Sequence, residues 1–135
     1  MYLLDTNALI ILLFGEVAGS SLSQRGLESM LSAEKLFLSI VSLWEMAIKI
    51  KINKLQIKSS IQAIEQNCRS QGIEIVPIKS AHVDMTLELP LLDDHKDPFD
   101  RLILATSIVE NIPLITTDNR MRRTEYLEFH ANVIW

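Results

Sequence analysis

The chain has 135 residues, of which 48 % are hydrophobic and 22 % are charged, and its formal net charge is −4. This size and composition predict one globular domain over residues 1–135 and exclude a disordered or fibrous protein. The single cysteine, Cys68, excludes an intrachain disulfide framework and a metal site built from cysteines. The acidic balance argues against nucleic-acid binding through bulk positive charge, although carboxylates that hold metal ions would contribute to that balance.

No signal peptide or membrane anchor is expected. Met1 is followed by neither a basic segment nor a cleavage site. The longest apolar run, residues 8–14, is much shorter than the roughly 20 residues that cross a bilayer. We therefore expect a cytoplasmic protein.

The N-terminal half of the chain predicts strands that alternate with helices. In chain order these are a strand at 2–4, a helix at 20–31, a strand at 36–40 and a helix at 42–51. The run Leu9–Phe14 is apolar on all sides, and two interpretations stay open: a fully buried short helix, or a helix face that a partner covers, to which Trp44 could contribute.

The C-terminal half continues the alternation. The predicted elements are a helix from Ser59 or Ser60 to Gly72, a strand at 73–78, helices at 81–87 and 98–111, and strands at 114–117 and 133–135. Asp97 suits the N-cap and Pro98 the first position of the clearest helix. The alternation predicts an α/β fold in which right-handed crossovers connect a mostly parallel sheet of four or five strands, covered by helices on both faces.

Four acidic residues fall where such a sheet binds ligands, beyond the carboxyl ends of its strands. Asp5 directly follows the first strand, and Asp118 directly follows the fourth. Glu45 lies in the first turn of the helix after the second strand. Asp100 lies in the first turn of the helix 98–111, and it reaches the same edge only if the loop before that helix climbs back there.

A convergence of these carboxylates would predict a particular chemistry. Close carboxylates repel one another unless a cation or a helix N-terminus compensates their charge. An all-oxygen cluster suits Mg²⁺ or Mn²⁺ better than zinc. Such an ion lowers the pKa of a bound water, which can then attack a phosphodiester in line. No histidine or serine nucleophile is required.

Each acid also has a structural interpretation. Glu45 fits a capping box with Ser42. Asp100 could favour the positive end of its helix dipole, and Asp118 could begin a turn. Asp5 has no obvious structural role, since aspartate is disfavoured beside a buried strand.

Four segments resemble motifs of the PIN-domain family. They are Leu4–Ile10, Ser42–Met46, His95–Ala105 and Thr116–Arg120. The third contains the specific Asp-Pro-Phe-Asp-Arg sequence and is similar to a segment typical of VapC-like toxins. The resemblance covers essentially the whole chain. It implies a three-layer α/β/α sandwich and a Mg²⁺- or Mn²⁺-dependent endoribonuclease. It also implies a toxin–antitoxin pair, in which the toxin is often a homodimer and a small DNA-binding antitoxin inserts a segment into the active site.

The resemblance also implies roles for individual residues. The catalytic and metal-binding set is Asp5, Glu45, Asp100 and Asp118. Thr6 would orient a metal-bound water or the phosphate, and Arg101 and Arg120 are candidate substrate contacts. For Arg120 and its basic neighbours, a solvated surface is an equally open interpretation. Asp97 is expected to cap its helix rather than to bind metal.

Two other functions stay open. The first is an α/β phosphatase or phosphotransferase with Asp5 as nucleophile. Such sites usually carry a second aspartate two positions later, where this chain has Asn7. The second is a non-catalytic PIN-like interaction protein whose carboxylates only support the fold.

Overall fold

The computed structural model of the chain describes residues 1–15, 19–129 and 131–135. Its strands form a single, fully parallel sheet in the order β3-β2-β1-β4-β5. The strands are β1 (Tyr2–Leu4), β2 (Leu36–Ser39), β3 (Ile73–Val76), β4 (Leu114–Ile115) and β5 (Val133–Ile134). The predicted parallel sheet is therefore confirmed, with β1 at its centre.

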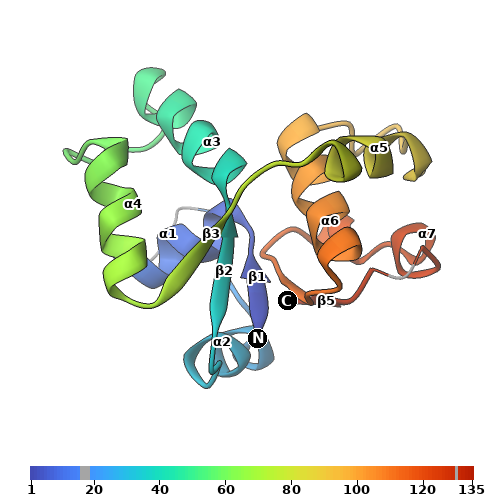
Figure 1. Cartoon of the computed structure of the whole chain (residues 1–135), viewed down its shortest axis with the longest axis horizontal. Helices are drawn as coiled ribbons and strands as arrows, with labels where there is room; N and C mark the ends of the chain where they lie inside the picture. The colour runs from blue at the N-terminus through green and yellow to red at the C-terminus, as the bar shows by residue number, and fades with distance from the viewer. Residues whose placement is uncertain (16–18, 130) are drawn as a thin grey trace.

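Helices cover both faces of this sheet (Figure 1). They are α1 (Thr6–Phe14), α2 (Gln24–Leu31), α3 (Ile40–Lys51), α4 (Ile61–Ser70), α5 (Ser80–Glu88), α6 (Pro98–Glu110), the 3₁₀ helix η1 (Asn119–Arg122) and α7 (Thr124–Leu127). In Figure 1, α1 and α4 lie on one side of the central strands, and α5, α6 and α7 lie on the other. The three-layer sandwich is confirmed.

Successive residues of β1 point to opposite faces of the sheet and join two separate cores. Leu3 packs in a cluster with Phe37 and the buried residues of α6. Leu4 packs in a second cluster with Leu38 and the buried residues of α1 and α4. A strand buried on both faces leaves only its ends accessible, so polar chemistry concentrates at the edge where β1 ends.

The predicted start of α3 is wrong by two residues. The helix begins at Ile40, and its N-cap is Ser39, whose hydroxyl accepts a hydrogen bond from the backbone N–H of Val41 at 3.3 Å. Ser42 is buried inside the helix, and its hydroxyl has no hydrogen-bond partner among the described residues. Glu45 therefore lies in the second turn and takes no part in a capping box, which leaves its carboxylate available for other contacts.

Other boundaries differ for local reasons. The helix predicted from residue 20 begins at Gln24, because Ser23 caps it. The fourth strand ends at Ile115 instead of Thr117, and the next two residues hydrogen-bond to the Asp5 carboxylate. The last two helices along the described chain, η1 and α7, carry no sequence pattern that distinguished them from a loop.

The apolar run in α1 is buried in its first half, as the first of the two interpretations predicted, and partly exposed at its end. Ala8, Leu9 and Ile10 are buried, whereas Phe14 is 44 % exposed. Among the described residues, no helix combines the length and the apolar character needed to cross a bilayer.

Candidate active site

Asp5 lies at the junction between β1 and α1 and is 4 % exposed. It is the N-cap of α1, and its Oδ1 accepts a hydrogen bond from the N–H of Ala8 at 2.6 Å. Its Oδ2 accepts one from the hydroxyl of Thr116 at 2.5 Å and one from the N–H of Thr117 at 3.1 Å. The two residues that follow β4 therefore hold the carboxylate that follows β1.

Glu45 reaches the same edge from α3. The hydroxyl of Thr6 donates a hydrogen bond to its Oε2 at 2.5 Å, and Lys49, one turn later, lies 3.4 Å from its Oε1. The Lys49 ammonium also donates to the side-chain oxygen of Asn7 at 3.2 Å. The first turn of α1 and the middle of α3 are thereby linked beside Asp5.

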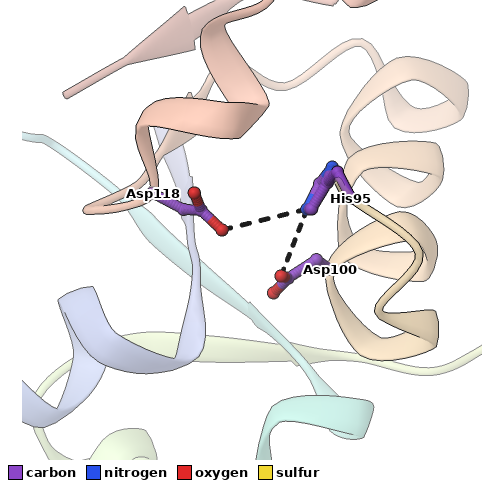
Figure 2. A group of neighbouring side chains, drawn as sticks. All are labelled: His95, Asp100 and Asp118. Atoms are coloured by element: carbon purple, nitrogen blue, oxygen red, sulfur yellow. Dashed lines mark hydrogen bonds and ion pairs between the residues drawn. The ribbon is translucent and has the colours of Figure 1, made fainter. Parts of the chain in front are cut away.

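Asp100 and Asp118 approach each other from the opposite side of the pocket. Asp97 caps α6, as predicted, accepting hydrogen bonds from the N–H groups of Phe99 and Asp100. Asp118 caps η1, and Asp100 lies in the first turn of α6. The carboxylates of Asp100 and Asp118 therefore both stand at helix N-termini. The Nε2 of His95 lies 3.2 Å from Oδ2 of Asp100 and 3.8 Å from Oδ2 of Asp118 (Figure 2).

All four predicted acids line one pocket of about 230 Å³. The loop before α6 does return to the carboxyl edge of the sheet, which the sequence left open. The residues that line the pocket are Asp5, Thr6, Asn7, Glu45, Lys49, Asp97, Asp100, Asp118 and Arg120. Five of these nine side chains are acidic, so they form a concentrated negative site with two cations at its margin.

Comparison with known proteins identifies the family. The model of the PIN domain matches residues 2–126, which is nearly the whole chain. This chain belongs to the PIN-domain family. A search of curated proteins finds no match.

Solved structures that resemble this PIN domain share its fold at low sequence identity. A toxin–antitoxin complex from Klebsiella pneumoniae is 20 % identical, with a TM-score of 0.59, over 100 % of this chain and 97 % of that one. VapBC2 from Rickettsia felis, bound to a promoter DNA fragment, is 17 % identical, with a TM-score of 0.63, over 98 % and 96 % of the two chains. FitAcB from Neisseria gonorrhoeae is 16 % identical, with a TM-score of 0.62, over 100 % and 97 %.

The acids of this PIN domain differ in their electrostatic setting. Burial raises the pKa of Asp5 from 3.8 to about 6, against the opposing effect of its hydrogen bonds. Burial also raises the pKa of Glu45, and nearby Asp100 adds to the rise. Burial alone would raise the pKa of Asp118, but hydrogen bonds and charge from Arg120 outweigh it and hold that pKa below its ordinary value.

The two predicted substrate-contacting arginines occupy different places. Arg120 lies at the pocket, donates to both carboxylate oxygens of Asp118, and is 4.0 Å from Asp100. Arg101 points away from the acids. Its guanidinium donates to the backbone carbonyls of residues 86, 89 and 90, near the end of α5. In this position Arg101 stabilises the loop before α6 and does not face the pocket.

Sequence reasoning assigned no role to three residues that organise the site. His95 is fully buried, and its Nδ1 lies 2.9 Å from the hydroxyl of Tyr126, which is also fully buried. Thr116 holds Asp5. His95 and Thr116 stand within the segments that resemble PIN motifs, but Tyr126 lies in α7, which had no recognisable pattern.

The donor set fits a hard divalent cation. The pocket presents carboxylate and hydroxyl oxygens, which Mg²⁺ and Mn²⁺ prefer, and contains no thiolate. Burial raises the pKa of the Asp5 carboxyl, so a compensating positive charge nearby would favour its ionised form. A divalent ion would supply that compensation. Asp5, Glu45, Asp100 and Asp118 are the predicted ligands of such an ion, and of these Asp100 and Asp118, together with His95, offer ligand atoms within 4.8 Å of one another.

Proposed function

We propose that this PIN domain is a Mg²⁺- or Mn²⁺-dependent endoribonuclease and the toxin of a toxin–antitoxin pair. One observation carries the proposal: four carboxylates from four separate segments line a single pocket at the carboxyl edge of the sheet. The structural neighbours support the toxin role, since one is described as a toxin–antitoxin complex and another as VapBC2.

The chemistry follows from the charge of the pocket. A divalent ion supplies Lewis-acid catalysis, which lowers the pKa of water and stabilises negative charge on the departing oxygen. The protein holds its carboxylates ready by hydrogen bonds from Thr6 and Thr116. Lys49 and Arg120, at the margin, provide positive charge for a phosphate that approaches the acids. Thr6 thus acts on Glu45, and its hydroxyl is not free to donate elsewhere while that bond persists.

The environment of Asp5 favours hydrolysis by water over an aspartyl nucleophile. Both oxygens of its carboxylate accept hydrogen bonds, from Ala8 to one and from Thr116 and Thr117 to the other. A carboxylate that is 4 % exposed and bonded at both oxygens is poorly placed to attack phosphorus. A phosphoenzyme trapped on Asp5 would support the phosphatase alternative instead.

The partner proposals draw on surfaces and neighbours. An antitoxin that binds DNA is supported by two neighbours: VapBC2, and a FitAB structure that is 18 % identical with a TM-score of 0.63, are each described as bound to a DNA fragment. A homodimer is supported by a row of exposed apolar residues along α3 and its C-cap, at four-residue spacing: Ile40, Trp44, Ile48 and Ile52. Trp44 is 63 % exposed and packs edge-on against Phe99 at 5.1 Å. An RNA-cleaving toxin would act in the cytoplasm, where its substrate is.

The dimer is tested by light scattering of the purified chain. We expect the mass of two copies for the wild type and of one copy for Ile48→Glu, because a charge on the apolar row would have to be buried in the interface. A wild-type protein that is monomeric throughout the micromolar range would contradict the homodimer.

The nuclease is tested by incubating purified protein with total RNA. Cleavage is expected with Mg²⁺ or Mn²⁺ and not with EDTA, and it should be lost in Asp100→Asn. Asp84→Asn is the matched control, because it makes the same change at an exposed position on α5. Undiminished cleavage in Asp100→Asn, or in EDTA, would overturn the proposal and favour a contaminating nuclease or a non-catalytic PIN domain.

A further inference from the structure

A buried histidine connects the two acids on one side of the pocket to the C-terminal part of the fold. His95 lies in the turn before α6, where its N–H bonds to the carbonyl of Leu92 at 3.1 Å. The side chain is fully buried, yet both ring nitrogens have polar partners. Nδ1 faces the hydroxyl of Tyr126, and Nε2 faces the carboxylates of Asp100 and Asp118 (Figure 2).

The partners define which nitrogen carries the proton in a neutral ring. An ionised carboxylate can only accept a hydrogen bond, so the nitrogen that faces Asp100 must be Nε2–H. The other nitrogen, Nδ1, is then an acceptor, and the Tyr126 hydroxyl is the donor that faces it at 2.9 Å. The tyrosine also packs edge-on against the imidazole, with ring centroids 5.5 Å apart. Tyr126 thereby fixes both the tautomer and the orientation of the ring.

We propose that His95, oriented by Tyr126, is a positioning residue that holds the Asp100 carboxylate for the divalent ion. This inference rests on the proposed metal-dependent function. The Nε2–H group engages Oδ2 of Asp100, whereas the described residues offer no hydrogen bond to its Oδ1. One oxygen is thus fixed by the protein, and the other stays available. Partners of this kind orient metal-binding side chains and tune their affinity in other metal sites.

The alternative source of charge compensation on this side is Arg120, which donates hydrogen bonds to Asp118 and to the carbonyl of Asp94. Its side chain is half exposed, and it would leave these partners to reach a phosphate. His95 cannot leave in this way, because it is enclosed on all sides. When Arg120 contacts substrate, the hydrogen bond from His95 remains to keep Asp100 in place. The two residues therefore have separate tasks, one at the substrate and one behind the carboxylate.

A second buried histidine provides a matched control. His82 in α5 is also fully buried, its Nδ1 accepts a hydrogen bond from the N–H of Lys79 at 3.1 Å, and its Nε2 lies 2.8 Å from Glu110. Glu110 ends α6, whereas Asp100 lies in the first turn of the same helix. The two histidines share burial and a carboxylate partner, and they differ in whether that carboxylate lines the pocket.

The experiment measures Mn²⁺ binding by the electron paramagnetic resonance of the free ion, without RNA. We expect His95→Leu to weaken Mn²⁺ binding by roughly ten- to a hundredfold. His95→Gln, which keeps an N–H donor near the position of Nε2, should recover most of the affinity. Tyr126→Phe should cause a smaller loss, because it removes only the group that fixes the ring. His82→Leu should bind Mn²⁺ as the wild type does.

A second measurement separates positioning from direct ligation. Long-range ¹H–¹⁵N spectra of the imidazoles should show the Nε2–H tautomer of His95 both without metal and with saturating Mg²⁺. Loss of that proton on adding Mg²⁺ would make His95 a ligand and overturn the positioning role. If His95→Leu does not fold, equal Mn²⁺ affinity in Tyr126→Phe and the wild type, with no change of the His95 tautomer in Tyr126→Phe, would also overturn it.

The two proposals fail in different ways. A wild-type protein that binds no Mn²⁺, or an Asp100→Asn variant that binds it equally well, overturns the metal-dependent function and the positioning role together. Tight binding by the wild type, with unchanged binding by a folded His95→Leu, overturns the positioning role alone.

Discussion

Asp5 and Glu45, on one side of the pocket, are held in a different way from Asp100 and Asp118, on the other. The first pair is buried or half-buried and accepts hydrogen bonds from hydroxyl and backbone groups, with Lys49 as its nearest cation. Their pKa values are raised. The second pair faces cationic or ring N–H donors, and the pKa of Asp118 is lowered.

This difference explains how the pocket can favour the binding of a cation and still keep its structure when no cation is bound. The first side leaves negative charge under-compensated, which favours binding of a positive ion. On the second side, Arg120 forms an ion pair with Asp118, which reduces the repulsion between the carboxylates of Asp100 and Asp118. A uniform set of four exposed acids would bind metal with less orientation, and a fully compensated set would not bind it at all.

The largest expected effect comes from removing one acid from each side. Asp5→Asn and Asp118→Asn should each reduce RNA cleavage, on the order of a thousandfold for Asp5, corresponding to about 4 kcal/mol of transition-state stabilisation. Their stabilities in EDTA at pH 8 should move in opposite directions. Asp5→Asn removes a poorly compensated buried charge and should stabilise the fold, whereas Asp118→Asn loses its Arg120 pair. Urea unfolding measures both, and equal shifts in the same direction would break the comparison.

The next effect is a pH dependence of stability in the absence of metal. The pKa of Asp5 in the folded protein, about 6, exceeds its ordinary value of 3.8. Its contribution to stability is therefore fully present below pH 4 and is lost as the pH rises through 6, by about 3 kcal/mol. Glu45 contributes in the same direction. Asp118, with a lowered pKa, contributes in the opposite direction, its stabilisation being lost as the pH falls.

Urea unfolding in EDTA between pH 4 and pH 8 measures this dependence. Asp5→Asn should flatten most of the decline between about pH 4 and pH 6, because the group whose ionisation causes it is gone. Adding saturating Mg²⁺ should flatten it in the wild type, since the ion favours the ionised carboxylates. A decline of the same size in Asp5→Asn would show that Asp5 is not its source.

Local patterns in the sequence predicted one part of this site, and long-range contacts determine the rest. Asp97-Pro98 and Gly72 mark helix ends through their own backbone preferences, and both were predicted correctly. The adjacency of Asp5 to a buried strand was enough to place it at the sheet edge. Nothing local distinguishes Ser39 from Ser42 as a cap, because the choice depends on where the parallel pairing with β3 ends.

Side-chain direction was the second limit. The motif that contains Arg101 predicted a residue of the site, but the carbonyls left free at the end of α5 capture its guanidinium. His95 and Tyr126 are separated by 31 residues, and only the packing of α7 brings them together. Acidic residues at the ends of predicted strands therefore identify the carboxylates of the site, but not the buried side chains, such as His95 and Tyr126, that contact them.

The two arginines extend the comparison to intermediate effects. Arg101→Ala should destabilise the fold by about 2 kcal/mol, because three backbone carbonyls lose a charged donor, while the metal-bound kcat of the remaining folded protein stays near that of the wild type. Arg120→Ala should change stability by less than about 1 kcal/mol, since the side chain is half exposed, and should mainly raise KM. Thermal unfolding and steady-state cleavage separate the two. A large stability loss in Arg120→Ala would mean that the second side depends on Arg120 for its structure.

The smallest effects should come from the two hydroxyls that hold the first side of the pocket. Thr6→Val and Thr116→Val each remove one hydrogen bond to a carboxylate while keeping nearly the same shape, and each should alter stability by about 1 kcal/mol. The Thr116 bond lowers the pKa of Asp5, so its loss should raise that pKa further and move the pH dependence to higher pH. Thr6→Val should leave the titration of Asp5 in place and act on Glu45. Identical pH profiles for the two variants would contradict the assignment of one threonine to each acid, and Thr6→Ser, which restores the hydroxyl, should behave as the wild type.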